Sequence, residues 1–129
     1  GEMSAHHYFR EFSFCDSGML VFLLVMELVS KAGKPLSALI GERMAKFPCS
    51  GEINSTVKDA AAILAALEKE YGARGTVNKV DGLSVEFPQW RFNLRLSNTE
   101  PVIRLNVETR GDKALLREKT DELLAKIRV

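Results

Sequence analysis

Two runs of alternating apolar and polar residues, joined by a short polar segment, constrain the fold of this chain most. Residues 90–96 are apolar at every even position, and residues 102–108 carry Ile103, Leu105 and Val107 between polar neighbours. A two-residue period is typical of a β-strand with one buried and one solvated face. We therefore predict two antiparallel strands whose hairpin tip lies within residues 95–101.

The predicted tip carries side chains suited to a phosphate monoester. Arg95 presents a planar fork of donors, and Arg104 starts the polar side of the return strand, so the two guanidinium groups can lie close together. Ser97 and Thr99 supply hydroxyls, and Asn98 supplies an amide and tolerates the positive φ of turns. Backbone N–H groups of such a turn can form an anion nest. The alternative is a polar turn that only caps itself, because these are ordinary turn residues.

Length and charge restrict the other classes of function. The chain has 129 residues, 46% of them hydrophobic, which suffices for one domain, or one small domain plus a remnant. A net charge of +1 with mixed signs argues against a nucleic-acid or membrane surface. The apolar run Met19–Met26 is too short to span a bilayer, which takes about 20 residues. Cys15 and Cys49 show no metal or redox spacing, so we interpret both as reduced thiols of a cytosolic protein.

Residues 49–129 have the pattern of a complete α+β domain. We predict strands at 50–56, 76–80, 83–87, 90–96 and 102–108. We also predict a helix that is capped by Thr56 and runs to Tyr71, and a helix opened by Gly111-Asp112. The first strand is expected at an edge of a small antiparallel sheet, with both helices packed on one face. Arg91, Arg95 and Arg104 would then face outward. In the last helix, Glu122 and Lys126 are predicted to form a surface ion pair.

Residues 1–48 are expected to be the partial α/β remnant of another domain. Helices are predicted over about 18–32, capped by Asp16 or Ser17 and stopped by Gly33, and from 34 to about 46. The first is apolar on all sides over residues 19–26. A helix of this kind needs cover on nearly every side. We therefore expect this region to be mobile, or to self-associate by burying the 19–26 helix against a second copy.

Before these helices, polar side chains alternate along the chain. Glu2, Ser4 and His6 would project to one side of an extended segment, where a carboxylate, a hydroxyl and an imidazole suit a polyol such as a sugar. The alternative is a frayed polar terminus. A metal site at His6-His7 is disfavoured because no third ligand has suitable spacing.

Two motifs in this order resemble the α-D-phosphohexomutase superfamily, in particular its bacterial phosphomannomutase (phosphomannomutase/phosphoglucomutase) branch. They are Gly-Glu-Met-Ser-Ala-His at residues 1–6 and Arg-Leu-Ser-Asn-Thr-Glu-Pro at residues 95–101. Supporting stretches are Phe-Pro-Cys-Ser-Gly-Glu-Ile-Asn at 47–54, Asp-Gly-Leu-Ser at 81–84 and Trp-Arg-Phe-Asn-Leu-Arg at 90–95. The resemblance covers essentially the whole chain, and assigns residues 1–48 to the third, sugar-binding domain and 49–129 to the C-terminal, phosphate-binding domain.

The resemblance implies a cytoplasmic enzyme that interconverts mannose 6-phosphate and mannose 1-phosphate. A phosphoserine and Mg²⁺ would do the chemistry, with a hexose 1,6-bisphosphate as intermediate and activator. By matching positions, Glu2, Ser4 and His6 would contact the sugar. A second set would hold the phosphate that is not reacting: Arg95, Ser97, Asn98, Thr99 and, more weakly, Arg104.

The resemblance also implies what this stretch lacks. The phosphoserine segment and the aspartates that hold Mg²⁺ have no match here, so we expect partners in the missing N-terminal domains and no activity from this stretch alone. The alternative from another functional class is a free-standing α+β module that binds a ligand or a protein without catalysis. Sequence alone leaves the choice between mannose and glucose open.

Overall fold

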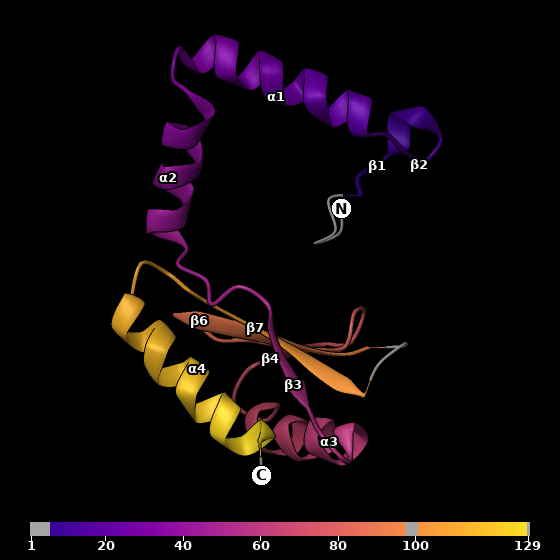
Figure 1. Ribbon diagram of the computed structural model, residues 1–129, viewed down its shortest axis with the longest axis vertical. Coiled ribbons are helices and arrows are strands. Elements are labelled where there is room, and N and C mark those ends of the chain that lie inside the picture. The colour runs from indigo at the N-terminus through magenta and orange to yellow at the C-terminus, as the bar shows by residue number, and fades with distance from the viewer. Residues whose placement is uncertain (1–5, 98–100, 129) are drawn as a thin grey trace. The chain divides into compact units, whose positions relative to one another are not determined.

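The structure is a computed structural model that describes residues 6–97 and 101–128. Contacts within the chain divide it into two compact units, residues 1–42 and 43–129. The larger unit contains a five-stranded antiparallel sheet in the order β3-β7-β6-β5-β4. The strands are β3 (Ile53–Thr56), β4 (Thr76–Asn78), β5 (Leu83–Glu86), β6 (Trp90–Leu96) and β7 (Val102–Thr109), and the helices are α3 (Ala60–Tyr71) and α4 (Lys113–Ile127). Both helices lie on the same side of the sheet (Figure 1), and β3 is an edge strand, so the predicted α+β fold is confirmed.

The core lies between the sheet and these two helices. Phe92 and Leu94 of β6 are fully buried and alternate with more exposed polar residues, as the two-residue period predicts. The rest of the core follows the same alternation in β5 and β7 and adds one face of each helix: Leu67, Tyr71, Leu83, Val85, Ile103, Leu105, Val107, Leu123 and Ile127. Burying each large apolar side chain contributes about 1.5–3 kcal/mol to the stability of the fold, so this face of the sheet is held against the helices by apolar packing.

The opposite face of the sheet is polar. In the register of β6 and β7, Arg95 lies opposite Arg104 and Arg91 lies opposite Glu108. The β3 residue Asn54 pairs with Arg104 from the other side. The arginines are exposed or half-buried between buried core residues, which confirms their predicted outward placement.

Two local predictions for the larger unit are wrong. Thr56 is not the cap of α3; it ends β3, and the cap is Asp59, whose carboxylate accepts the N–H of Ala62 at 2.9 Å. The pairing of β3 with β7 includes Thr56, which lies opposite Val102, so a loop must follow Thr56 before the helix can start.

The predicted direct ion pair between Glu122 and Lys126 does not form among the described residues, and Lys126 acts on Glu122 through its charge alone. Glu122 instead accepts hydrogen bonds from the Tyr71 hydroxyl at 2.5 Å and from Lys119 at 2.7 Å. Lys126 reaches Glu70 of α3 at 2.8 Å. Residue spacing along α4 predicts contacts within α4 only. Tyr71 and Glu70, which contact Glu122 and Lys126, belong to α3 on the same face of the sheet.

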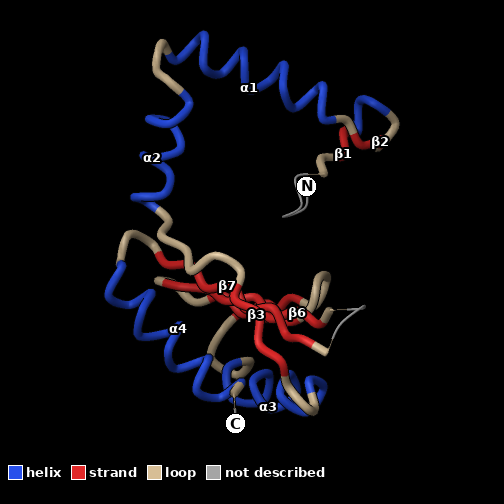
Figure 2. The backbone as a smooth tube through the Cα atoms, viewed as in Figure 1, coloured by secondary structure: helices blue, strands red, loops and turns tan. Residues whose placement is uncertain are grey.

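The smaller unit contains a short two-stranded ladder and helices. β1 (Tyr8–Phe9) and β2 (Cys15–Asp16) pair antiparallel around a 3-10 turn, which sequence reasoning does not anticipate. α1 (Gly18–Ala32) begins at Ser17, whose Oγ accepts the Leu20 N–H at 3.2 Å, and ends at Gly33. α2 spans Leu36–Lys46, so its last turn already belongs to the larger unit, and Figure 2 shows both helices in blue. Most of the large apolar side chains of α1 are about half exposed or more. None of the described helices has the length and apolar character that crossing a membrane requires.

Candidate functional site

The end of the β6–β7 hairpin brings three predicted phosphate-binding residues to one hollow. Arg95 and Arg104 face each other across the two strands, and each side chain is about a third exposed, at 32% and 31%. With Ser97 they line an open hollow of about 410 Å³. Its other lining residues are Leu64, Asp81, Gly82 and Leu96. The hollow therefore brings two partly exposed guanidinium groups together at the hairpin end of the sheet.

Carboxylates approach both guanidinium groups without saturating them. Glu52, just before β3, places one oxygen 3.4 Å from an Arg95 nitrogen and the other 3.9 Å from Nε of Arg104. Asp81 lies 3.5 Å from another Arg95 nitrogen. The Nε atom of Arg104 is buried and has no hydrogen-bond partner within the described ranges 6–97 and 101–128. A buried donor of this kind costs free energy until an acceptor reaches it.

A tight turn fixes one wall of the hollow. Gly82 has φ of +74°, and a Cβ atom there would lie 2.5 Å from the carbonyl oxygen of Leu94. Glycine is therefore required where the β4–β5 turn approaches the backbone of β6. The Asn93 amide donates to the Asp81 carbonyl at 2.7 Å and to Ser84 Oγ at 2.9 Å, which ties this turn to the strand that carries Arg95.

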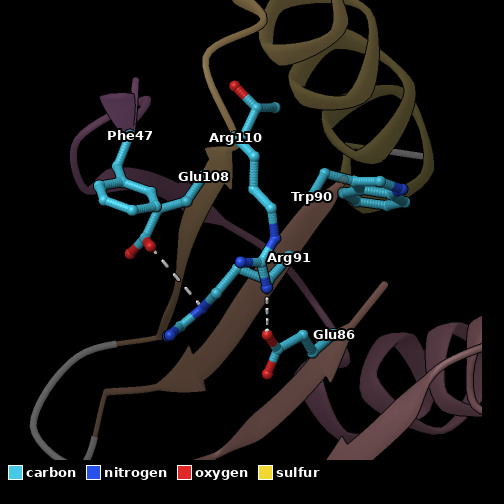
Figure 3. A pocket seen from close by; sticks show the side chains of 7 residues that line it. Phe47, Glu86, Trp90, Arg91, Glu108 and Arg110 are labelled. Carbon is cyan, nitrogen blue, oxygen red and sulfur yellow. Dashed lines mark hydrogen bonds and ion pairs between the residues drawn. The ribbon is translucent and has the colours of Figure 1, made fainter. Parts of the chain in front are cut away.

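A second hollow at the other end of the same strands has a different charge arrangement. It measures about 170 Å³ and is lined by Phe47, Glu86, Trp90, Arg91, Glu108, Thr109 and Arg110. Figure 3 shows each arginine directed at its own carboxylate. Arg110 meets Glu86 at 2.9 Å, and Arg91 meets Glu108 at 3.9 Å. Each arginine of this second hollow has a carboxylate of its own, whereas the two arginines of the first hollow share Glu52.

The predicted sugar-binding segment is described only at His6. Its Nδ1 lies 2.5 Å from a carboxylate oxygen of Asp16, and the other oxygen accepts the His7 N–H at 3.0 Å. The hydrogen bond with His6, followed by that from His7, holds the pKa of the Asp16 carboxyl below its ordinary value. Glu2, Ser4, Asn98 and Thr99 lie outside the described residues. Across 6–97 and 101–128, no three His, Cys, Asp or Glu side chains gather as metal ligands.

Two family models match the chain. Residues 52–126 match the one described as phosphoglucomutase/phosphomannomutase, C-terminal domain, and residues 1–47 match that for its alpha/beta/alpha domain III. The chain belongs to the phosphoglucomutase/phosphomannomutase family. The arginine hollow lies within the part that matches the C-terminal domain of this family.

Named relatives support this assignment. The chain is 59% identical over 124 residues to proteins of Xanthomonas campestris named phosphohexose mutases, and 54% identical over 126 residues to an Escherichia coli phosphomannomutase. These matches cover 95% and 97% of the chain but 28% of each relative, so the chain spans little more than a quarter of their length.

A solved structure that is similar to this chain is of a protein named for the same family. A phosphoglucomutase/phosphomannomutase family protein from Burkholderia thailandensis matches with a TM-score of 0.71 and 27% identity. The match covers 98% of this chain and 27% of that one. The fold and the family assignment therefore agree.

Sequence reasoning missed the two carboxylates of the arginine hollow. Glu52 lies 43 positions before Arg95, and their contact depends on β3 pairing with β7. A signal was present in the alternation of β3. Glu52 and Asn54 have the same parity, and Asn54 pairs with Arg104, so both side chains belong to the polar face once that pairing is known.

Proposed function

We propose that this chain is the substrate-gripping C-terminal part of a phosphomannomutase, an intramolecular phosphotransferase. The longer enzyme would interconvert mannose 6-phosphate and mannose 1-phosphate through a phosphoserine and a hexose 1,6-bisphosphate. The observation that carries the proposal is the facing pair Arg95 and Arg104 in an open hollow, where the buried Nε of Arg104 has no hydrogen-bond partner among residues 6–97 and 101–128. Relatives named phosphomannomutase support mannose as the sugar.

In this proposal the hollow binds the phosphate group that is not reacting. Arg95 and Arg104 supply charge-assisted hydrogen bonds, which are the strong donors for phosphate. Ser97 joins them, and Asn98 and Thr99 are added on the motif of residues 95–101. Glu2, Ser4 and His6 are proposed to contact sugar hydroxyls through carboxylate, hydroxyl and imidazole groups.

A phosphate grip separate from the reacting centre fits this class of reaction. Phosphoryl transfer depends mainly on positioning and on charge stabilisation. Binding energy from a remote phosphate can be used to orient the reacting end of the substrate. We assign the phosphoserine and the ligands of Mg²⁺ to other parts of the longer protein, and expect no mutase activity from these 129 residues alone. We further propose a cytoplasmic role that supplies mannose 1-phosphate for GDP-mannose.

Binding is tested by NMR titration of the labelled chain with mannose 1-phosphate and, separately, with inorganic phosphate. We expect amide shifts confined to residues 95–104 and an affinity of about millimolar, since a few charge-assisted bonds are worth about 4 kcal/mol net of binding costs. Shifts elsewhere only, or none at high ligand concentration in both this chain and the full-length enzyme, would overturn the proposed phosphate site.

Catalysis is tested by Arg95→Ala in the full-length enzyme. Losing a charge-assisted bond to the substrate phosphate should reduce kcat/KM by about 2–3 kcal/mol, roughly 30- to 150-fold. Arg110→Ala is the matched control, because it removes the same charge from the second hollow, where Glu86 already pairs with the arginine. Equal kcat/KM for the wild type and Arg95→Ala would contradict the assignment.

A further inference from the structure

We propose that Glu52 is a resident counter-ion of the phosphate site, which competes with the incoming phosphate for Arg95 and Arg104. This inference rests on the proposed function and adds a residue that limits how tightly the site holds its ligand. Glu52 touches both arginines, one with each carboxylate oxygen, and its side chain is 24% exposed. Among the described residues, Glu52 is therefore the carboxylate that contacts both cations of the hollow.

The contacts of Glu52 act through charge more than through hydrogen bonds. Its distances of 3.4 Å to Arg95 and 3.9 Å to Arg104 exceed the 2.7–3.2 Å of a good N–H···O bond. Nε of Arg104, which lies 3.9 Å from Glu52, is without a hydrogen-bond partner in the described part of the chain. Glu52 thus lowers the potential at both guanidinium groups but leaves donors for another acceptor to use.

Among the described residues, the charges that line the hollow are balanced before any ligand arrives. Two guanidinium cations face the carboxylates of Glu52 and Asp81. Asp81 is 69% exposed, so water screens its charge, whereas the largely covered Glu52 is screened less. A phosphate dianion that binds both arginines must therefore approach a carboxylate that already attracts them, and like-charge repulsion opposes its binding.

The second hollow shows that this sheet does not need a shared carboxylate to place its arginines. There Arg91 and Arg110 each have their own partner, Glu108 and Glu86. At the hairpin end Glu52 contacts both arginines and Asp81 contacts Arg95 alone, so Arg104 has no carboxylate of its own among the described residues, which leaves donor capacity for a ligand. An enzyme whose bisphosphate intermediate must turn over also needs to release the phosphate it holds, and a built-in competitor speeds that release.

Glu52→Gln tests the inference, because glutamine keeps the shape and one acceptor oxygen but removes the charge. In NMR titrations of the 129-residue chain with inorganic phosphate, we expect binding at least about fivefold tighter and a steeper loss of affinity with salt. The pKa of the bound phosphate, followed by ³¹P NMR, should fall, because the site then favours the dianion more. A purely structural role for Glu52 would not move that pKa.

Glu86→Gln is the matched control, since it removes one negative charge at the other end of the sheet. It should leave phosphate affinity within about twofold of wild type, because screened charges beyond about 10 Å act weakly. Unchanged or weaker binding in Glu52→Gln, with wild type still shifting residues 95–104, would overturn the counter-ion role alone. Absence of hairpin shifts in both proteins would overturn this role and the proposed phosphate site together.

Discussion

Replacing Gly82 by alanine should destabilise the larger unit strongly. At φ of +74°, the new Cβ atom would lie 2.5 Å from Leu94 O, 3.0 Å from Arg95 Cα and 3.2 Å from Leu94 C. All three atoms belong to the backbone of β6, so no flexible side chain can move aside. The strand itself must shift.

The size of the effect follows from two separate costs. Holding an L-residue in the left-handed region costs about 1–2 kcal/mol, and forcing extra atoms into a packed site costs about 1–3 kcal/mol. Gly82→Ala should therefore lower the free energy of unfolding by about 2–5 kcal/mol, a large part of the roughly 5–15 kcal/mol that holds a domain together. Shifting β6 should also displace Arg95, which lies in the strand that is pushed.

Urea unfolding followed by Trp90 fluorescence measures this loss, because Trp90 is the single tryptophan and packs against Phe87 and Phe92. Gly51→Ala is the control that carries the conformational cost without the steric one. Gly51 has φ of +69° but open space around its added Cβ, so its substitution should cost only the conformational strain, about 1–2 kcal/mol. Equal losses for the two variants would refute the steric argument.

Three further predictions concern the core, the pH dependence of stability and the exposed helix. Phe92→Ala should cost about 3–5 kcal/mol in urea unfolding, because Phe92 is fully buried with its ring 5.4 Å from that of Tyr71; a loss below about 1 kcal/mol would contradict this packing. The hydrogen bond from Lys119, followed by that from Tyr71, lowers the pKa of Glu122 from 4.5, so its contribution to stability is present above about pH 4.5 and disappears as pH falls through the lowered value. Glu122→Gln should flatten this acid limb of the curve of unfolding free energy against pH, and an unchanged limb would argue against the pair. Phe22→Glu should abolish concentration-dependent association in sedimentation velocity, because Phe22 is 57% exposed on the apolar helix α1, whereas a wild type that stays monomeric at every concentration would refute self-association.

Local patterns were enough to predict most of the fold. The alternation in β6 and β7 predicts both strands and their buried faces, since pleating imposes that period directly. The bounds of α1 follow from Ser17 and Gly33, whose capping is a local property. Strand ends were less predictable: β4 stops at Asn78, whose side chain accepts the Val80 N–H at 2.8 Å and starts the turn early.

The site was predictable only in part, because its residues come from separate strands. The facing of Arg95 and Arg104 follows from hairpin register, which turn length and alternation determine. The involvement of Glu52 depends on which strand lies beside β7, and nothing local to residues 50–56 specifies that neighbour. The contact of Glu122 with Tyr71 was unpredictable for the same reason, because it depends on α3 lying beside α4.

The sheet order also has a consequence for how the arginine hollow assembles during folding. β6 and β7 are joined by a short connection and can pair within microseconds, which brings Arg95 and Arg104 together early. Pairing of β3 with β7 must close a much longer loop, and such non-local contacts form more slowly. The two cations therefore meet before their shared carboxylate arrives, and repulsion between them opposes the hairpin in that interval. Phosphate in the refolding buffer should relieve this repulsion and accelerate the folding of this chain.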